Sequence, residues 1–146
     1  MNASAPARHA AVALLAAALA SPCAAQPALD DLAGGWRFET APQHIYRCVI
    51  RGHATALKEN RGLRIEIEAT ETCPSGEIHR AEETCTGQFA GARLMVSCKV
   101  VAAEPRAYNA DQFALRIDSA TQMTGRLFDG DVWNDTVTWR RDDWVS

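Results

Sequence analysis

The chain has 146 residues and a formal net charge of −3, and charged residues make up 23% of it. This length allows one domain with its own core and is too short for two. The basic residues are scattered, with a single adjacent pair at Arg140 and Arg141, so the sequence lacks the clustered positive charge of a nucleic-acid-binding protein.

The amino terminus predicts a secretory signal peptide. Arg8 precedes an apolar run, Ala10–Ala20, and the small residues Cys23 and Ala25 match a cleavage site directly after Ala25. The apolar run is too short for a membrane span, which needs about 20 residues. Pro22 ahead of Cys23 disfavours a lipidated cysteine, because lipoprotein signals normally have a small residue there.

Removal of residues 1–25 leaves residues 26–146 as one domain. We expect this domain in the periplasm or the medium of a Gram-negative bacterium, where disulfides persist. The preference for arginine over lysine is typical of a GC-rich bacterial genome. No second segment predicts a membrane span, and we expect a monomer.

Period-two alternation of apolar and polar residues predicts eight strands in the mature chain. A helical turn is predicted at Pro27–Leu32, and the longest loop at Ala102–Asp111. Short turn signals separate the other segments and favour hairpins over crossovers. These features predict an all-β fold, an antiparallel up-and-down barrel, with a two-sheet sandwich as the alternative. The strands are predicted around Trp36–Phe38, Tyr46–Ala56, Leu63–Thr70, Ala81–Phe89, Leu94–Val100, Phe113–Ile117, Met123–Leu127 and Val137–Trp139.

The hairpin turns also predict how the four remaining cysteines pair. Residues that face each other across a hairpin have a constant index sum, so the position of the turn decides which side chains meet. Turns at Asn60–Arg61 and Gly91–Ala92 predict the disulfides Cys48–Cys73 and Cys85–Cys98. Each is worth ~3 kcal/mol in the chain-entropy model. A zinc site is not expected, since the sequence has no Cys-x-x-Cys spacing.

The same register places ionisable side chains on the inward face. Glu71 is expected opposite His79, Tyr46 shares that face, and Glu83 faces apolar residues of both neighbouring strands. These four residues form a hypothetical ligand-binding set. Solvation at a barrel mouth is the simpler explanation of Glu71 and His79, and an acid–base pair is a third interpretation. Glu83 has to be paired or protonated, or it marks a hydrated cavity.

No other pattern predicts catalysis or a cofactor. The histidines His44, His53 and His79 share no metal-ligand spacing. None of the serines stands in a nucleophile-elbow context. The sequence therefore predicts a protein that is not an enzyme and needs neither metal nor cofactor.

The two ends of the predicted barrel carry a family resemblance. Gly34-Gly35-Trp36, with Arg140 or Arg141 in the last strand, resembles the Gly-x-Trp motif and closing arginine of the calycin barrels. That superfamily includes lipocalins and bacterial metalloprotease inhibitors. The resemblance implies that the arginine covers Trp36 where the first and last strands meet.

A longer stretch, Leu32–Ile50, is similar to the opening of the secreted metalloprotease inhibitors. In those proteins the segment ahead of the barrel enters the protease cleft, which implies an inhibitory segment here at Gln26, Pro27, Ala28 and Leu29. A later run, Asn109–Phe113, looks more like uncharacterised secreted proteins of alphaproteobacteria and implies no activity.

The function predicted from sequence is a non-enzymatic periplasmic or secreted binding module. The ligand is either a small molecule in the barrel interior or a protein at the rim. The alternative is a metalloprotease inhibitor, with a secreted protease as its partner. A carrier predicts an interior cavity near the ionisable residues, whereas an inhibitor predicts a filled interior.

Overall fold

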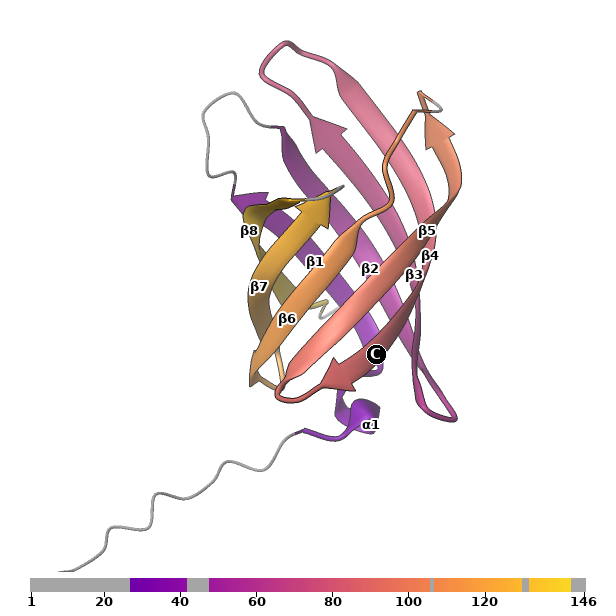
Figure 1. Ribbon diagram of the computed structural model, residues 1–146, viewed down its shortest axis with the longest axis vertical. Coiled ribbons are helices and arrows are strands. Elements are labelled where there is room, and N and C mark those ends of the chain that lie inside the picture. Colours follow the sequence, from indigo (N-terminus) through magenta and orange to yellow (C-terminus); the bar gives the residue numbers. More distant parts are fainter. Residues whose placement is uncertain (1–26, 42–47, 106, 130–131, 143–146) are drawn as a thin grey trace, which may run out of the picture.

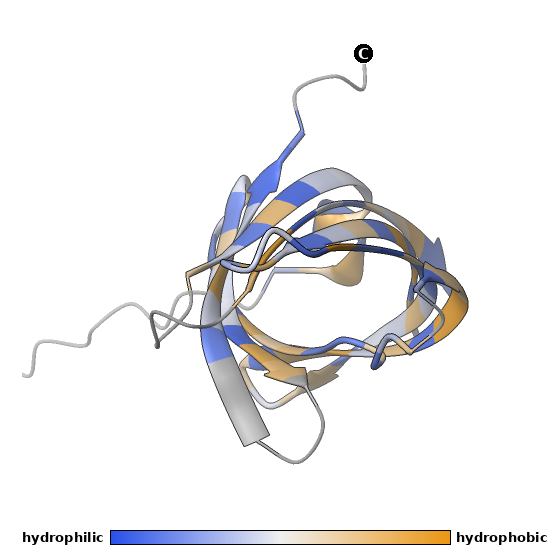
Figure 2. Ribbon diagram, turned by 90° about the horizontal axis from the view of Figure 1, so that it is seen from above, coloured by the Kyte–Doolittle hydropathy of each residue, from blue (hydrophilic) through white to orange (hydrophobic). Residues whose placement is uncertain are grey.

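The computed structural model describes residues 27–41, 48–105, 107–129 and 132–142. In these ranges the chain forms one short helix and eight strands that close into a barrel (Figures 1 and 2). The elements are α1 (Leu29–Leu32), β1 (Gly34–Ala41), β2 (Val49–Glu59), β3 (Gly62–Thr72), β4 (Ile78–Ala90), β5 (Arg93–Glu104), β6 (Gln112–Ser119), β7 (Gln122–Asp129) and β8 (Val132–Arg141). No helix in the described ranges has the length and hydrophobicity needed to cross a bilayer.

The predicted up-and-down barrel is confirmed. Each strand pairs antiparallel with its neighbour in sequence, and β1 also pairs with β8, where Phe38 faces Trp139. This last pairing closes the sheet into one continuous ladder, so the sandwich alternative is wrong. Closure gives every strand an inward and an outward face, and β5 pairs with β6 over Arg93–Ser97 only.

Both predicted disulfides are confirmed. Cys48–Cys73 lies just beyond the ends of β2 and β3, and Cys85–Cys98 lies within the β4–β5 ladder; the Cα atoms are 4.0 Å apart in each. The hairpin between β3 and β4 turns at Gly76, whose φ of 89° favours glycine. Cys48–Cys73 therefore ties together one end of the barrel, beside this tip.

A bulge in β5 interrupts the simple hairpin register. Glu83 faces Val100, but its neighbour Glu82 faces Ala102, so Val101 is the extra residue. The side chain of Val101 is 66% exposed. Beyond the bulge, β5 continues to Glu104, well into the segment expected to be a loop.

An aromatic cluster fills the middle of the barrel. Phe38 stacks on Trp139 with ring centroids 5.1 Å apart, and Phe113 meets both rings edge-on at 5.5 and 5.2 Å. All three are almost fully buried, and each contributes about 2–3 kcal/mol of hydrophobic stabilisation. Gly52 is small for a reason, because a β-carbon there would overlap the Phe38 ring and lie 2.7 Å from the Glu68 carbonyl oxygen.

The helix α1 covers the end of the barrel opposite the β3–β4 tip (Figure 1). Leu32 is 1% exposed and belongs to the core, and Leu29 packs against it. The indole Nε1 of Trp36 donates a hydrogen bond to the Leu32 carbonyl at 2.9 Å. The segment ahead of β1 is thus part of the barrel's closed end.

Arg141, at the end of β8, holds this closed end together. Its guanidinium lies over Trp36, with Cζ 4.4 Å from the ring centroid. The same group donates hydrogen bonds to the carbonyls of Asp31, Ala33 and Ala120. One side chain therefore joins the helix segment, the first strand, the last strand and the β6–β7 turn.

We predict that Arg141→Ala lowers the free energy of unfolding by about 2–3 kcal/mol, through loss of the cation–π contact and several hydrogen bonds. Arg140→Ala is the matched control, because Arg140 is exposed on the outer wall and should cost under about 0.5 kcal/mol. Urea denaturation of both variants measures the difference. Equal losses of unfolding free energy for the two variants would show that the Arg141 contacts do not stabilise the closed end.

Candidate functional site

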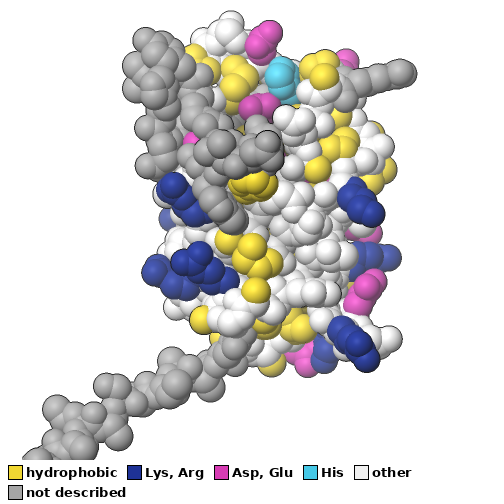
Figure 3. Space-filling view, in the orientation of Figure 1, with side chains coloured by type: hydrophobic (Ala, Val, Ile, Leu, Met, Phe, Trp, Pro, Cys, Tyr) yellow, Lys and Arg dark blue, Asp and Glu magenta, His cyan; other side chains and the backbone are white. Residues whose placement is uncertain are grey.

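Ionisable side chains gather inside the barrel at the end opposite α1. We call Glu71, His79, Glu83, Tyr108 and Asp111 the interior polar cluster. They come from β3, from β4 and from the connection between β5 and β6. Figure 3 shows a histidine and acidic side chains together at this end of the molecule.

Glu71 and His79 form the outer part of the cluster. They face each other across β3 and β4, as the register predicts, and His79 Nδ1 lies 3.0 Å from Glu71 Oε2. Their side chains are 25% (His79) and 21% (Glu71) exposed, so water reaches both. The pair forms an ion pair whenever the imidazole is protonated.

Glu83 forms the floor of the cluster. It is 2% exposed and faces Ile67 and Val100, as predicted. Its Oε1 accepts a hydrogen bond from the Asp111 backbone N–H at 2.9 Å, and its Oε2 meets no N–H donor in the described part of the chain. Burial raises the pKa of Glu83, and hydrogen bonds from the Asp111 backbone and side chain offset part of that rise. Glu83 therefore holds its proton more strongly than an exposed glutamate does.

The sequence did not predict Tyr108 and Asp111 as site residues. Asp111 is 2% exposed, and the Tyr108 hydroxyl lies 3.3 Å from Asp111 Oδ2. Burial raises the pKa of Tyr108 far above its usual range, and the negative charges of Asp111, Glu83 and Glu71 raise it further. Tyr108 therefore stays protonated and acts as a donor. The index sum of a hairpin does not predict the partners of these residues, because the β5–β6 connection is too long to fix a register.

Two groups of potential metal ligands lie close together in the described residues, and each includes a disulfide. Glu71 lies with Cys48 and Cys73, and Glu83 lies with Cys85 and Cys98. Sulfur atoms in a disulfide are poor metal ligands, since the thiolate is the binding form. Neither group is therefore arranged as a metal centre.

The other predicted site residues lie elsewhere. Tyr46 and Gln26 fall outside the described residues. Pro27, Ala28 and Leu29 lie at the closed end, opposite the interior polar cluster. An inhibitory role for them stays a prediction, and any truncation that reaches Leu32 also removes a core residue.

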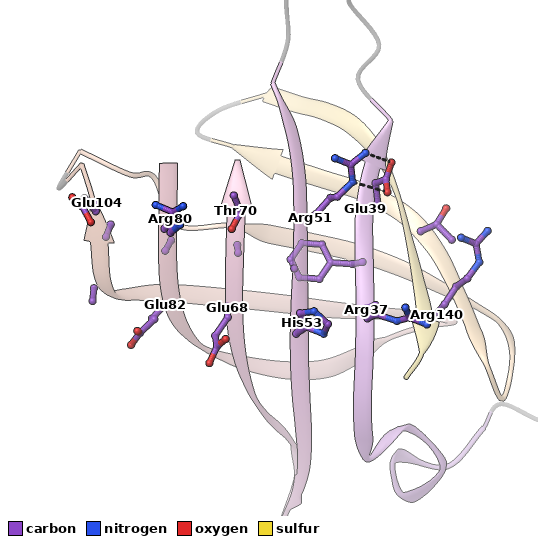
Figure 4. A pocket seen from close by; sticks show the side chains of 17 residues that line it. Arg37, Glu39, Arg51, His53, Glu68, Thr70, Arg80, Glu82, Glu104 and Arg140 are labelled. Carbon is purple, nitrogen blue, oxygen red and sulfur yellow. Dashed lines mark hydrogen bonds and ion pairs between the residues drawn. The ribbon is translucent and has the colours of Figure 1, made fainter. Parts of the chain in front are cut away.

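A second feature, which we call the outer groove, runs across the outer wall over β8, β1, β2, β3, β4 and β5. Its volume is about 940 Å³. One row of side chains crosses it in strand order, Arg140, Arg37, His53, Glu68 and Glu82, each facing the next in the ladder. Figure 4 shows the last four of these residues in a line.

A second row lies closer to the open end of the barrel. Glu39 and Arg51 pair there through two hydrogen bonds of 2.9 and 3.1 Å. The hydrogen bond from Arg51 lowers the pKa of Glu39, so this pair is ionised and locally neutral. Thr70 and Arg80 continue the row. None of the predicted ligand-binding residues lines this groove.

No family model matches this chain, and no curated protein matches it significantly. Solved structures of designed barrels are similar in fold. A redesigned beta barrel, b11L5F_LGL, aligns with TM-score 0.56 and 17% identity over 79% of this chain and 95% of its own. A de novo designed fluorescence-activating beta barrel aligns with TM-score 0.56 and 13% identity over 78% of this chain and 96% of its own. The redesigned barrel mFAP0, bound to DFHBI, aligns with TM-score 0.55 and 19% identity over 76% of this chain and 99% of its own.

The raised pKa of Glu83 gives a prediction for stability. Between the ordinary pKa of glutamate and the raised folded-state pKa, the folded state binds more protons than the unfolded state. Stability therefore falls as pH rises through this interval, by at most about 1.4 kcal/mol for each pH unit. Glu83→Gln keeps a hydrogen-bond acceptor for the Asp111 N–H and removes the titration, so its stability should fall less over the same range.

Urea denaturation at a series of pH values measures this effect. The matched control is Glu82→Gln, which changes the neighbouring outward-facing carboxylate and should retain the wild-type slope. A wild-type slope in Glu83→Gln would show that Glu83 titrates normally.

Proposed function

We propose that the protein is a non-enzymatic binding module that takes up a small, positively charged molecule, such as an alkylamine, at the interior polar cluster. Glu83 carries the proposal. Its carboxyl is almost completely buried, and the donor it has in the described residues is the Asp111 group rather than a cation. A carboxyl in that position either keeps a proton or takes a cation as its partner.

The surroundings of Glu83 favour an ammonium ligand. Burial raises the pKa of Tyr108, and Asp111, Glu83 and Glu71 raise it further when they are ionised, so the cluster becomes negative once its carboxyl groups lose their protons. Glu71 and His79 are partly exposed, so a ligand from solvent meets these two side chains first. An incoming ammonium would therefore meet carboxylate acceptors along its whole path inward.

The fold and the sequence motifs support a ligand-binding role. A structurally similar barrel, mFAP0, is bound to DFHBI, which is a precedent for a ligand in a barrel of this architecture. The Trp36 and Arg141 contact is the arrangement implied by the resemblance to calycin barrels. The signal peptide expected at residues 1–25 and the two disulfides support a periplasmic or secreted location, and a monomer stays our expectation.

Isothermal titration calorimetry with n-butylamine and putrescine tests the proposal. The ammonium group displaces the proton held by Glu83, so binding should release a proton and strengthen as the pH rises. Repeating the titration in buffers with different ionisation enthalpies measures that proton. We expect Glu83→Gln to weaken binding about tenfold, because a charge-assisted hydrogen bond is lost.

Two controls separate the charge from other effects. Glu66→Gln removes an outward carboxylate from β3 outside the outer groove and should bind like the wild type. n-Butanol has the same alkyl chain without the charge and should bind far more weakly than the amine. Equal affinity for amine and alcohol, or binding without proton release, would contradict the proposal.

A further inference from the structure

We propose that the outer groove binds a short peptide with free amino and carboxyl ends, lying across the strands. This site is separate from the interior polar cluster, on the other face of the same wall. Its ligand would place the carboxylate at Arg37 and Arg140, and the ammonium at Glu68 and Glu82.

Two like-charged pairs define the ends of the groove. Arg37 faces Arg140 across β1 and β8, and Glu68 faces Glu82 across β3 and β4. Like charges directly opposite each other destabilise an antiparallel pair. A ligand with one charge at each end relieves both repulsions at once.

Few internal partners compensate these charges. Glu68, Glu82 and Arg140 have no ion pair or side-chain hydrogen bond within the described part of the chain, although the charge of Arg140 contributes to the lowered pKa of Glu39. Asp142 is an exception at the basic end, because it lies 3.4 Å from both Arg37 and His53. Arg140 is therefore the cation most available to a ligand carboxylate.

The spacing of the two ends fits a peptide of about four residues. Neighbouring strands lie about 4.8 Å apart, so three strand intervals, about 14 Å, separate the Arg37–Arg140 pair from the Glu68–Glu82 pair. An extended chain rises about 3.3 Å per residue and covers this distance with roughly four residues. A single amino acid and a zwitterionic lipid headgroup are both too short to reach the two ends.

The depth of the groove follows from the residues behind it. At the level between the two charged rows, the inward side chains facing one another across β2 to β5 are Gly52, Ala69, Ala81 and Ala103. Gly52 has no β-carbon, so the Phe38 ring lies directly against β2 at this level. Charged side chains from both rows border the groove, and strand backbone forms its floor at this level (Figure 4).

A length series of alanine peptides tests the proposal on the wild-type protein. Dialanine, tetraalanine and hexaalanine with free ends are titrated by NMR, with amide shifts recorded at the groove. We expect tetraalanine to bind most tightly, and its acetylated, amidated form to bind about tenfold more weakly. This comparison requires no protein variant, so no folding defect affects it.

Variants then assign each end of the peptide. Glu68→Gln/Glu82→Gln should weaken binding of free tetraalanine about five- to tenfold and leave the N-acetylated peptide unaffected. Arg37→Gln/Arg140→Gln should weaken binding of free tetraalanine by a similar factor and leave the C-amidated peptide unaffected. The matched control is Glu59→Gln/Glu66→Gln, which removes two outward carboxylates from β2 and β3 outside the groove.

The outcomes that overturn the proposal are specific. Equal affinity of free and doubly capped peptides, no dependence on length, or control variants as weak as the groove variants would each do so. Shifts confined to the interior polar cluster would also overturn it. None of these results bears on amine binding at Glu83, so the two proposals fail separately.

Discussion

The pairing of β1 with β8 is the constraint on which the rest of the structure depends. It closes an alternating ladder, so each side chain is assigned to the interior or to the outer wall by its position alone. Phe38 and Trp139 meet inside at this seam, and Arg37 and Arg140 meet outside. In an open sheet, inward and outward residues would both reach water. Burial would then no longer raise the pKa of Glu83.

The two ends of the barrel are stabilised in different ways, and the proposed amine site lies at the end that α1 does not cover. At the closed end, Arg141 and Leu32 fill the opening with a cation–π contact, hydrogen bonds and a buried leucine. At the open end, the Cys48–Cys73 disulfide constrains the chain without filling the interior. Buried polar groups accumulate beside it, where a partly hydrated mouth lowers the cost of their desolvation.

The sequence predicted much of the fold, because hairpin register is a local property. The turn positions were enough to pair all four cysteines and to place Glu71 opposite His79. The bulge at Val101 was missed, since an inserted residue leaves the apolar alternation almost unchanged. Asp111 and Tyr108 were missed because a long connection positions them, and no periodicity describes such a segment. The outer groove depends on curvature of the wall, which arises only when the whole ladder is closed.

The central claim is that burial in the closed barrel raises the pKa of Glu83, and the ionisation of this residue tests it most directly. Carbon-13 NMR of the side-chain carboxyl, assigned with Glu83→Gln, reports its titration in the folded protein. The account predicts a midpoint clearly above that of the exposed glutamates. A midpoint in the range of the exposed glutamates would contradict it.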